Sequence, residues 1–330
     1  MRAVVITKYG APGVLKVEER PEPVAGPGEV VIDVASAGVN FADVMARLGF
    51  YADAPKAPCI VGYEVAGTVS ELGEGVTELA LGDRVAAATR FGGQAERVVV
   101  NAAHTMRIPD ANSFSEAAAV PVNYSTAWAG LVRYGNLQPG ERVLIHAAAG
   151  GVGIAATQVA RQLGAEIYGT ASPQKHSHLQ LDHVLDYTKK GWQDGLPKFD
   201  IVMDAIGGKS FRNSYNMLAP GGRLVCYGAS SVVGGERRNF VTALRTLAQM
   251  PRFSMVKQMT QSKAIIGLNM LTLWDAAGSL DPWMQPVNAM LAAGTIKPVI
   301  AEEFSFEHAG DAHRLLSSRG NIGKVILTPR

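Results

Sequence analysis

Residues 143–170 decide the fold of this chain, and they read VLIHAAAGGVGIAATQVARQLGAEIYGT. The apolar start is typical of a buried strand, which turns through glycines into an amphipathic helix and then a second strand. Glycines at such a turn let phosphate approach the backbone, and the free N–H groups and dipole of the helix N-terminus favour negative charge. The stretch therefore predicts a pyrophosphate site, and with it a dinucleotide cofactor and hydride chemistry.

The glycine pattern departs from the usual G-x-G-x-x-G. Ala148 occupies the first glycine place, while Gly150 and Gly153 occupy the other two. A glycine pattern alone is weak evidence, and its position between an apolar strand and a helix is what strengthens it. The alternative interpretation is a tight strand–helix turn in some other α/β protein.

The residues after the second strand bear on the choice of cofactor. An NAD site usually carries Asp or Glu about 20 residues beyond the glycines, to bind the ribose 2′-OH. Residues 171–175 read ASPQK, without a carboxylate. A hydroxyl and a cation suit a 2′-phosphate, so the sequence favours NADPH over NADH. Ser172 followed by Pro173 is also an ordinary helix start, and both interpretations can hold together.

The composition is that of an ordinary globular enzyme. The chain is 47% hydrophobic and 18% charged. Its 330 residues are too many for one typical core and suit two domains. A net charge of +2 gives no general basic field for nucleic acid or an anionic membrane. Two cysteines imply no disulfide framework, and neither a leader nor an integral membrane segment is expected. We therefore expect a cytoplasmic enzyme with a small-molecule substrate.

The spacing of apolar runs predicts an α/β chain with a discontinuous first domain. Residues 1–120 read as short β-rich runs between glycine turns. Residues 121–269 contain continuous apolar strands alternating with helices, which indicates a doubly wound parallel sheet covered on both faces. Residues 270–330 read helix, strand, helix, strand, and are expected to return to the first domain. Within the middle domain, the basic and Met-rich segment 231–262 predicts two short helices. It is interpreted either as a lid or membrane-touching arm, or as an ordinary packed insertion.

With these patterns in hand, the chain resembles the medium-chain dehydrogenase/reductase superfamily, and more closely its zinc-free quinone oxidoreductases, the zeta-crystallin-like group. The resemblance covers essentially the whole chain. Its most specific marker is residues 38–43, GVNFAD, followed by Arg47, Gly49 and Tyr51. The supporting markers are GYE at 62–64, GDRV at 82–85, NYSTAW at 123–128, Asp204 with Gly207 and Gly208, and NIGK at 321–324. Segment 231–262 and residues 169–172 further resemble the vesicle amine transport protein branch.

The resemblance implies a Rossmann domain inserted in a mainly β, GroES-like catalytic domain. Zinc-dependent relatives hold the catalytic metal with Cys, His and Cys or Asp, and the matching places here are Asn40, Tyr63 and, near the last, Val122. An amide, a phenol and a valine make no competent zinc site. His176 and His178 form an H-x-H whose side chains are expected to diverge, so no metal is predicted. Without a Lewis acid, hydride transfer to an already electrophilic quinone or α,β-unsaturated carbonyl remains feasible.

The resemblance also implies site residues. Asn40, Tyr51 and Tyr63 are the expected catalytic residues, lining the nicotinamide cleft and hydrogen-bonding the acceptor oxygen or the ribose. The expected cofactor-binding residues are Asn40, Asn123, Gly150, Gly151, Val152, Gly153, Ser172, Lys175, Tyr187, Gly228, Leu268, Asn269 and Asn321.

Several of these residues have ordinary structural alternatives. Asn40 could serve only as a helix N-cap, and Tyr63 and Tyr187 could be core residues. Lys175 could be a solvated lysine. Asp43 and Arg47 lie four apart on one expected helix, where a surface ion pair is the usual interpretation.

The predicted function is therefore NADPH-dependent, zinc-independent reduction of a quinone or an α,β-unsaturated carbonyl. An enoyl-thioester reductase is a close alternative, and a non-catalytic NADPH-binding scaffold or vesicle-associated protein belongs to a different class. Balanced charge argues against a nucleic-acid role. A homodimer is expected, formed by edge pairing of a strand at 264–268.

Overall fold

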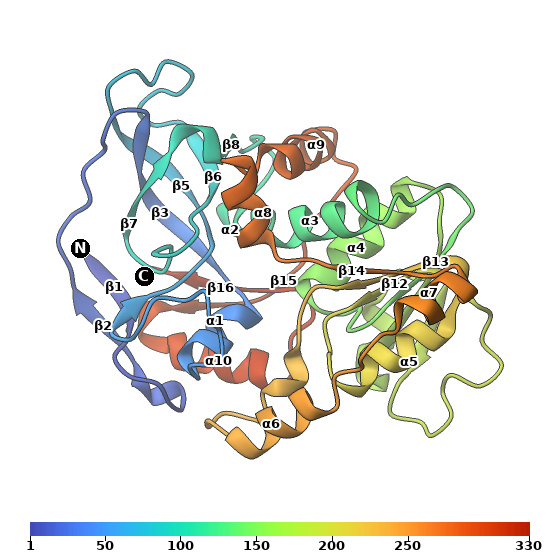
Figure 1. The fold of residues 1–330 in the computed structure, drawn as a ribbon. Coiled ribbons are helices and arrows are strands. Elements are labelled where there is room, and N and C mark those ends of the chain that lie inside the picture. Colours follow the sequence, from blue (N-terminus) through green and yellow to red (C-terminus); the bar gives the residue numbers. More distant parts are fainter. The chain divides into compact units, whose positions relative to one another are not determined.

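Six parallel strands form the sheet that the glycine turn predicts (Figure 1). Their order in the sheet is β11, β10, β9, β12, β13, β14, and every neighbouring pair is parallel. The bounds are β9 Arg142–Ile145, β10 Glu166–Ala171, β11 His183–Asp186, β12 Phe199–Asp204, β13 Leu218–Cys226 and β14 Ala264–Gly267. The chain winds outward from β9 to β11 and then resumes at β12 on the other side of β9, so the order reverses beside β9.

The computed structural model describes all 330 residues, Met1–Arg330, and the chain divides into two compact units. The parallel-sheet unit contains Thr126–Gly234 and Asn239–Met270. The β-rich unit contains Met1–Ser125, Gly235–Arg238 and Leu271–Arg330. The predicted fold class is confirmed, because one unit holds a doubly wound parallel sheet and the other holds mainly antiparallel sheets.

Helices connect the parallel strands, as a parallel sheet requires. The turn-forming glycines lead into α4, and α5 joins β12 to β13. The bounds of the helical elements from 129 to 262 are η3 Ala129–Arg133, α4 Gly151–Gln162, η4 Pro173–His178, α5 Lys209–Met217, η5 Ser230–Val232, α6 Phe240–Ala248 and α7 Met255–Gln261. The two short helices predicted in segment 231–262 are thus present as α6 and α7.

The β-rich unit contains a three-stranded sheet, β2-β1-β4, and a seven-stranded sheet in the order β15-β16-β3-β5-β6-β8, with β7 paired to β3. The strands of the first sheet are β1 Arg2–Ile6, β2 Leu15–Glu19 and β4 Cys59–Ile60. Those of the second are β3 Glu29–Val39, β5 Glu64–Leu72, β6 Arg84–Ala88, β7 Arg97–Asn101, β8 Thr105–Arg107, β15 Ile300–Ser305 and β16 Lys324–Thr328. Strand β16 therefore joins the C-terminal segment to the N-terminal sheet.

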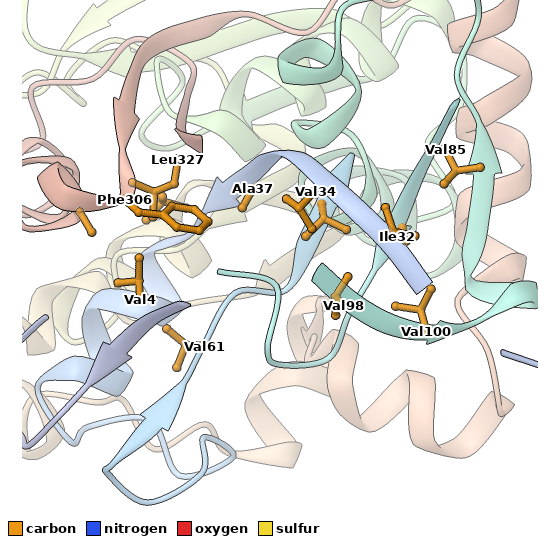
Figure 2. Close-up of a cluster of buried hydrophobic side chains, with 14 of the residues drawn as sticks. Val4, Ile32, Val34, Ala37, Val61, Val85, Val98, Val100, Phe306 and Leu327 are labelled. Atoms are coloured by element: carbon orange, nitrogen blue, oxygen red, sulfur yellow. The ribbon is translucent and has the colours of Figure 1, made fainter. Parts of the chain in front are cut away.

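The core of the β-rich unit consists of small branched side chains from these strands (Figure 2). Val4, Ile32, Val61 and Val85 are fully buried, and Phe306 is packed with them. Strand β3 is buried along most of its length because it has neighbours on both sides. The remaining helical elements are η1 Pro12–Val14, α1 Phe41–Arg47, η2 Ala102–His104, α2 Phe114–Ala118, α3 Pro121–Trp128, α8 Met270–Ala277, α9 Asp281–Ala292, η6 Phe306–His308 and α10 Ala309–Ser317.

Several element boundaries differ from the sequence-based expectations. The sequence predicts a helix over residues 125–134, but α3 begins earlier, at Pro121, a residue that suits a first helical position because it lacks an N–H. The sequence also predicts a strand over residues 223–227, whereas β13 begins at Leu218 and ends at Cys226. Strand β11 and helices α5 and α8 were not anticipated; each is short, and none exceeds nine residues. None of the helices reaches the length and apolarity that a membrane crossing needs.

Candidate functional site

The glycine turn lies between β9 and α4, at the carboxyl edge of the parallel sheet. Gly150 is the N-cap residue of α4 and has extended backbone, with φ −78° and ψ 170°. The first intrahelical bond runs from the Ile154 N–H to the Gly150 carbonyl at 2.9 Å. The N–H groups of the first turn of α4, from Gly151 to Gly153, have no carbonyl partner within the helix and therefore remain available to an anion. Strand order reverses beside β9, which is where such sheets bind ligands.

Close packing requires glycine at one position of the turn. A Cβ at Gly153 would lie 2.4 Å from the Ala147 carbonyl oxygen and 2.7 Å from Ala148 Cα, so only glycine lets α4 pack this closely. A Cβ at Gly150 would meet only the Ala147 oxygen, at 3.3 Å. Ala148, in the first glycine place, is buried, and the left-handed conformation falls instead on Ala147, with φ 52°. The turn thus keeps its close packing without the first glycine.

A buried chain of polar side chains supports the turn from beneath. Ser214 donates its hydroxyl to Asp204 Oδ2 at 2.7 Å, so its oxygen accepts from His146 Nε2 at 3.0 Å. His146 Nδ1 then accepts from the Thr170 hydroxyl at 3.2 Å, and Thr170 Oγ1 accepts the Ala147 N–H at 3.3 Å. Burial lowers the pKa of His146, which favours the neutral ring, and the Ser214–Asp204 bond determines which ring nitrogen carries the proton. The chain ties β9, β10, β12 and α5 to the backbone of the turn.

Sequence reasoning missed this polar chain, although a signal was present. His146, Thr170 and Asp204 each stand at or just beyond the carboxyl end of an apolar strand. Polar residues at that position converge on one edge of a parallel sheet, so their side chains are brought together although the chain separates them by 24 and 58 residues.

The residues predicted to hold a 2′-phosphate lie at the carboxyl ends of β10 and β11. The parallel register pairs Ala171 with Asp186, so Ser172 and Tyr187 directly follow on neighbouring strands. Ser172 precedes η4 without using its side chain as a cap. Lys175 is 9% exposed and burial lowers its pKa, so the solvated-lysine alternative is wrong. Tyr187 is 44% exposed, so the alternative of a core tyrosine is wrong as well.

At the same edge of the sheet, Gly228 lies just after β13, and Leu268 and Asn269 lie just after β14. A Cβ at Gly228 would meet Ala205 at 3.2 Å, which indicates a close approach between the loops after β12 and β13. Leu268 extends β14 by donating its N–H to the Cys226 carbonyl at 2.9 Å. Leu268 is buried and Asn269 is exposed. All the cofactor residues predicted in the parallel-sheet unit therefore lie at its carboxyl edge.

In the β-rich unit, Asn40 belongs to a buried charge network. Asn40 occupies the N-cap position of α1, but its side chain does more than cap the helix, because its Nδ2 donates to Glu64 Oε1 at 3.0 Å. Its Oδ1 accepts from Lys324 Nζ at 2.6 Å, and Lys324 also pairs with Glu64. The second carboxylate oxygen of Glu64 accepts the Val122 N–H at 2.7 Å. Glu64 and Lys324 were recognised only as motif residues, and sequence reasoning assigned them no role.

The other two predicted catalytic residues share an aromatic cluster. The rings of Tyr51 and Tyr63 meet edge to face with centroids 6.2 Å apart, and Phe91 packs on Tyr63 at 5.4 Å. Tyr63 is 6% exposed, and its buried hydroxyl has no hydrogen-bond partner. Burial raises the pKa of Tyr51 to about 12 and raises that of Tyr63 as well. Both phenols therefore stay protonated at neutral pH and can act only as neutral donors or acceptors.

The expected surface ion pair between Asp43 and Arg47 is wrong, because both side chains are fully buried and face different partners. Asp43 accepts the N–H groups of Asn40 at 2.7 Å and Gly62 at 3.0 Å, and burial raises its pKa to about 7. Arg47 donates to the carbonyls of Gly10 and Glu236 and to His313 Nδ1. Helix α1 is packed on both of these sides, which its short sequence did not reveal.

The remaining predicted cofactor residues are Asn123 and Asn321. In the sequence, each lies within three residues of a member of the charge network, Val122 or Lys324. Asn123 follows Val122 in α3 and is 4% exposed. Asn321 donates its Nδ2 to the Gly323 carbonyl at 2.8 Å, one residue before Lys324. No group of three or more His, Cys, Asp or Glu side chains is placed to hold a metal ion. The oxygens of Asn40 and Glu64 are instead engaged by an ammonium group.

The chain is similar to known proteins over its whole length. Residues 26–110 match the alcohol dehydrogenase GroES-like domain family, and residues 179–327 match the zinc-binding dehydrogenase family. The human synaptic vesicle membrane protein VAT-1 homolog is 37% identical over 347 residues, covering 100% of this chain and 86% of the human protein.

Several solved structures are similar to this chain as well. A mycobacterial protein in complex with NADPH has a TM-score of 0.86 at 29% identity, covering 100% of both chains. A Pseudomonas syringae quinone oxidoreductase has a TM-score of 0.84 at 30% identity over 99% of each chain. The CurK enoyl reductase has a TM-score of 0.86 at 26% identity over 99% of this chain and 98% of that chain.

These matches define an oxidoreductase fold class, the medium-chain dehydrogenases and reductases. The chain belongs to this superfamily and, within it, to the family of the VAT-1 homologues. The resemblance drawn from the sequence motifs is thereby confirmed.

Proposed function

We propose that this protein is an NADPH-dependent reductase that transfers hydride to a quinone or an α,β-unsaturated carbonyl without a metal ion. The observation that carries the proposal is the carboxyl edge of the parallel sheet. A glycine turn fit for pyrophosphate lies there, and the buried Lys175 beside Ser172 stands where an NAD site carries a carboxylate. The NADPH complex of the similar mycobacterial protein and the similar quinone oxidoreductase support it.

The protein's own residues would bind and orient the cofactor. Gly150, Gly151, Val152 and Gly153 would hold the pyrophosphate through backbone N–H groups. Ser172, Lys175 and Tyr187 would hold the 2′-phosphate end, and Gly228, Leu268, Asn269, Asn123 and Asn321 would contact the rest. Bound NADPH supplies the hydride.

In the β-rich unit, Asn40 and Tyr51 would donate hydrogen bonds to the acceptor oxygen, where negative charge develops as hydride reaches the conjugated carbon. Tyr63 would shape the same site through its ring. Because the oxygens of Asn40 and Glu64 bind an ammonium group rather than presenting free lone pairs, the proposed chemistry uses no zinc. Activity that survives chelation, in protein with no stoichiometric metal by elemental analysis, is the expected result.

The cofactor is tested by titrating NADPH and NADH with fluorescence detection. We expect NADPH to bind more tightly, and Lys175→Ala to weaken NADPH roughly 10- to 100-fold, as loss of a charge-assisted hydrogen bond implies. NADH affinity should not change. Lys190→Ala, at an exposed lysine of the same unit, is the matched control. Equal affinity of the parent protein for both cofactors would end the assignment.

The acceptor is tested with a panel of a naphthoquinone, phenanthrenequinone, a simple enone and an enoyl-CoA. Turnover of quinones or enones supports the proposal. The similar CurK enoyl reductase makes an enoyl-thioester reductase the second candidate, which preferential turnover of the enoyl-CoA would favour. Tight NADPH binding without turnover of any acceptor would instead favour a scaffold or vesicle-associated role.

We further infer a cytoplasmic homodimer. Strand β14 is the last strand of the parallel sheet, and its outer edge can pair with the same strand of a second copy. Light scattering after size-exclusion chromatography should report twice the chain mass of 34.9 kDa. The substitution Ile265→Pro should reduce that mass. Because the Leu268 N–H bonds β13 and N–H groups alternate along a strand, the Ile265 N–H faces the outer edge, and proline removes it. A monomeric parent would exclude the dimer.

A further inference from the structure

Lys324 is a buried charge with two side-chain partners. It begins β16, is 3% exposed, and its ammonium group bonds both Glu64, which is 0% exposed, and Asn40. Burying an ion pair is costly unless the remaining donors and acceptors are satisfied. Here the second oxygen of Glu64 takes the Val122 N–H at 2.7 Å. Both oxygens of the Glu64 carboxylate are therefore engaged.

The fold makes room for this pair at Gly38. A Cβ at Gly38 would lie 2.7 Å from Glu64 Cγ and Oε1 and 2.7 Å from Lys324 Cε. Gly38 stands opposite Ile326 in the antiparallel pairing of β3 with β16. A glycine within an otherwise branched, buried strand weakens the strand, and the two charged side chains passing over it supply the reason for it.

The network leaves one orientation for the Asn40 amide. An ammonium group only donates and a carboxylate only accepts, so Oδ1 must face Lys324 and Nδ2 must face Glu64. Nδ2 carries two hydrogens, and Glu64 takes one of them. Asn40 is half-buried whereas its two charged partners are fully buried. The second Nδ2 hydrogen is thus the donor that the network can offer to a ligand.

We propose that Lys324 is a positioning residue of the reductase, which fixes the Asn40 amide with its N–H toward the acceptor oxygen and strengthens that N–H as a donor. The inference rests on the proposed function. When the acceptor gains hydride at carbon and NADPH is oxidised, the displaced electron pair moves to the acceptor oxygen, which water later protonates. A cation bound to Oδ1 draws electron density from the amide, so the Nδ2 hydrogens bind the developing oxyanion more strongly.

The competing explanation is that the ion pair only holds β16 in the sheet. Lys324→Met alone cannot decide between them, because it leaves Glu64 buried without a partner and threatens folding. The double variant Lys324→Met/Glu64→Gln removes both charges. The side-chain carbonyl of the introduced glutamine can still accept the Val122 N–H, while its N–H₂ group draws Asn40 Oδ1 and reverses the Asn40 amide.

The experiment compares kcat, KM and NADPH affinity in the parent, the double variant, Asn40→Ala and the triple variant. We expect the double variant to keep its NADPH affinity and to lose kcat roughly 10- to 100-fold, in the range of one lost oxyanion donor or less. Adding Asn40→Ala to it should cost nothing further. Arg97→Met, which removes an exposed ion pair with Asp33 in the same unit, is the control.

A second readout needs no turnover. With asparagine labelled in ¹⁵N, the Asn40 Nδ2 hydrogens are identified by their loss in Asn40→Ala. They should shift in the double variant and in Gly38→Ala, which displaces the pair but keeps both charges. A folded double variant with parental kcat, or additive losses on adding Asn40→Ala, would overturn the inference while leaving the reductase intact. An inactive parent would instead remove the proposed function and, with it, this inference.

Discussion

Among single residues, close packing decides which positions are irreplaceable. Gly153 and Gly150 both belong to the glycine turn, but they meet different surroundings. The Cβ of an alanine at 153 would press on the Ala147 carbonyl at 2.4 Å, while one at 150 would approach the same oxygen only to 3.3 Å. Backbone atoms in a buried turn cannot move aside as a flexible side chain would.

We therefore expect Gly153→Ala to destabilise the protein by roughly 1–3 kcal/mol, the usual cost of overpacking. Gly150→Ala should cost less, because its Cβ finds more space. Urea denaturation followed by fluorescence measures both. Equal losses at the two positions would show that the packing of α4 against β9 does not depend on this glycine.

His313 is one of two buried histidines, with His146, whose lowered pKa makes the stability of the folded chain depend on pH in the acid range. Burial, with Arg47 beside it, lowers the pKa of His313 to about 3. The unfolded chain binds a proton at this residue below pH ~6.5 and the folded chain does not, so stability falls as pH drops from about 6.5 toward 3. Asp43, with its pKa raised to about 7, works in the opposite direction over the same range.

The contribution of His313 is isolated by comparing the parent with His313→Gln, because Asp43 is common to both. The unfolding free energy of the parent should fall relative to the variant by roughly 3 kcal/mol between pH 7 and pH 4, about 1.4 kcal/mol for each pH unit crossed. Chemical denaturation at a series of pH values gives the difference. A constant difference across the range would mean that the ring is protonated in the folded state.

Among the secondary-structure elements, α6 and α7 expose apolar side chains where a surface helix usually exposes polar ones. More than half of the exposed large hydrophobic side chains of the chain lie on them, namely Phe240, Val241, Leu244, Leu247, Met255, Val256 and Met259. The buried positions of α6 are the small residues Ala243 and Thr246, and Thr246 bonds the Ser231 carbonyl at 2.9 Å. Helix α6 therefore packs through the face that carries these small residues.

The double variant Leu244→Ser/Leu247→Ser should change the unfolding free energy by less than about 1 kcal/mol, since exposed substitutions usually stay within about ±0.5 kcal/mol each. Because serine has a lower helix propensity than leucine, the double variant should be slightly less stable than the parent. Ala243→Asp, on the buried face, should cost several times more. Thermal and urea unfolding report the two cases, and a large loss for the double serine variant would place these leucines in an interface.

For the molecule as a whole, ligand binding should stabilise the folded chain by mass action. NADP⁺ at 100 times its dissociation constant contributes about 2.7 kcal/mol, which raises the melting temperature by several degrees. NAD⁺ at the same concentration should contribute less. Lys175→Ala should remove half or more of the NADP⁺ shift without lowering the melting temperature of the free protein. If neither nucleotide changes the melting temperature of the parent, the protein has no dinucleotide site.

Features that depend on near neighbours in the chain could be predicted from the amino-acid order alone. The strand–turn–helix at 143–162 is local, so apolar runs, glycine spacing and the absence of a carboxylate at 171–175 indicate the fold and the cofactor class directly. The two helices of segment 231–262 and the parallel strands followed from the same local periodicity.

Contacts between distant residues became visible only in the folded chain. Lys324 reaches Asn40 across 284 residues, and His146 reaches Ser214 across 68. Such contacts depend on strand register and on space left by residues like Gly38, which no local pattern encodes. The burial of Asp43 and Arg47 was hidden for the same reason. A short helix shows the spacing of its charges, but only the elements packed around it determine whether those charges face water or the core.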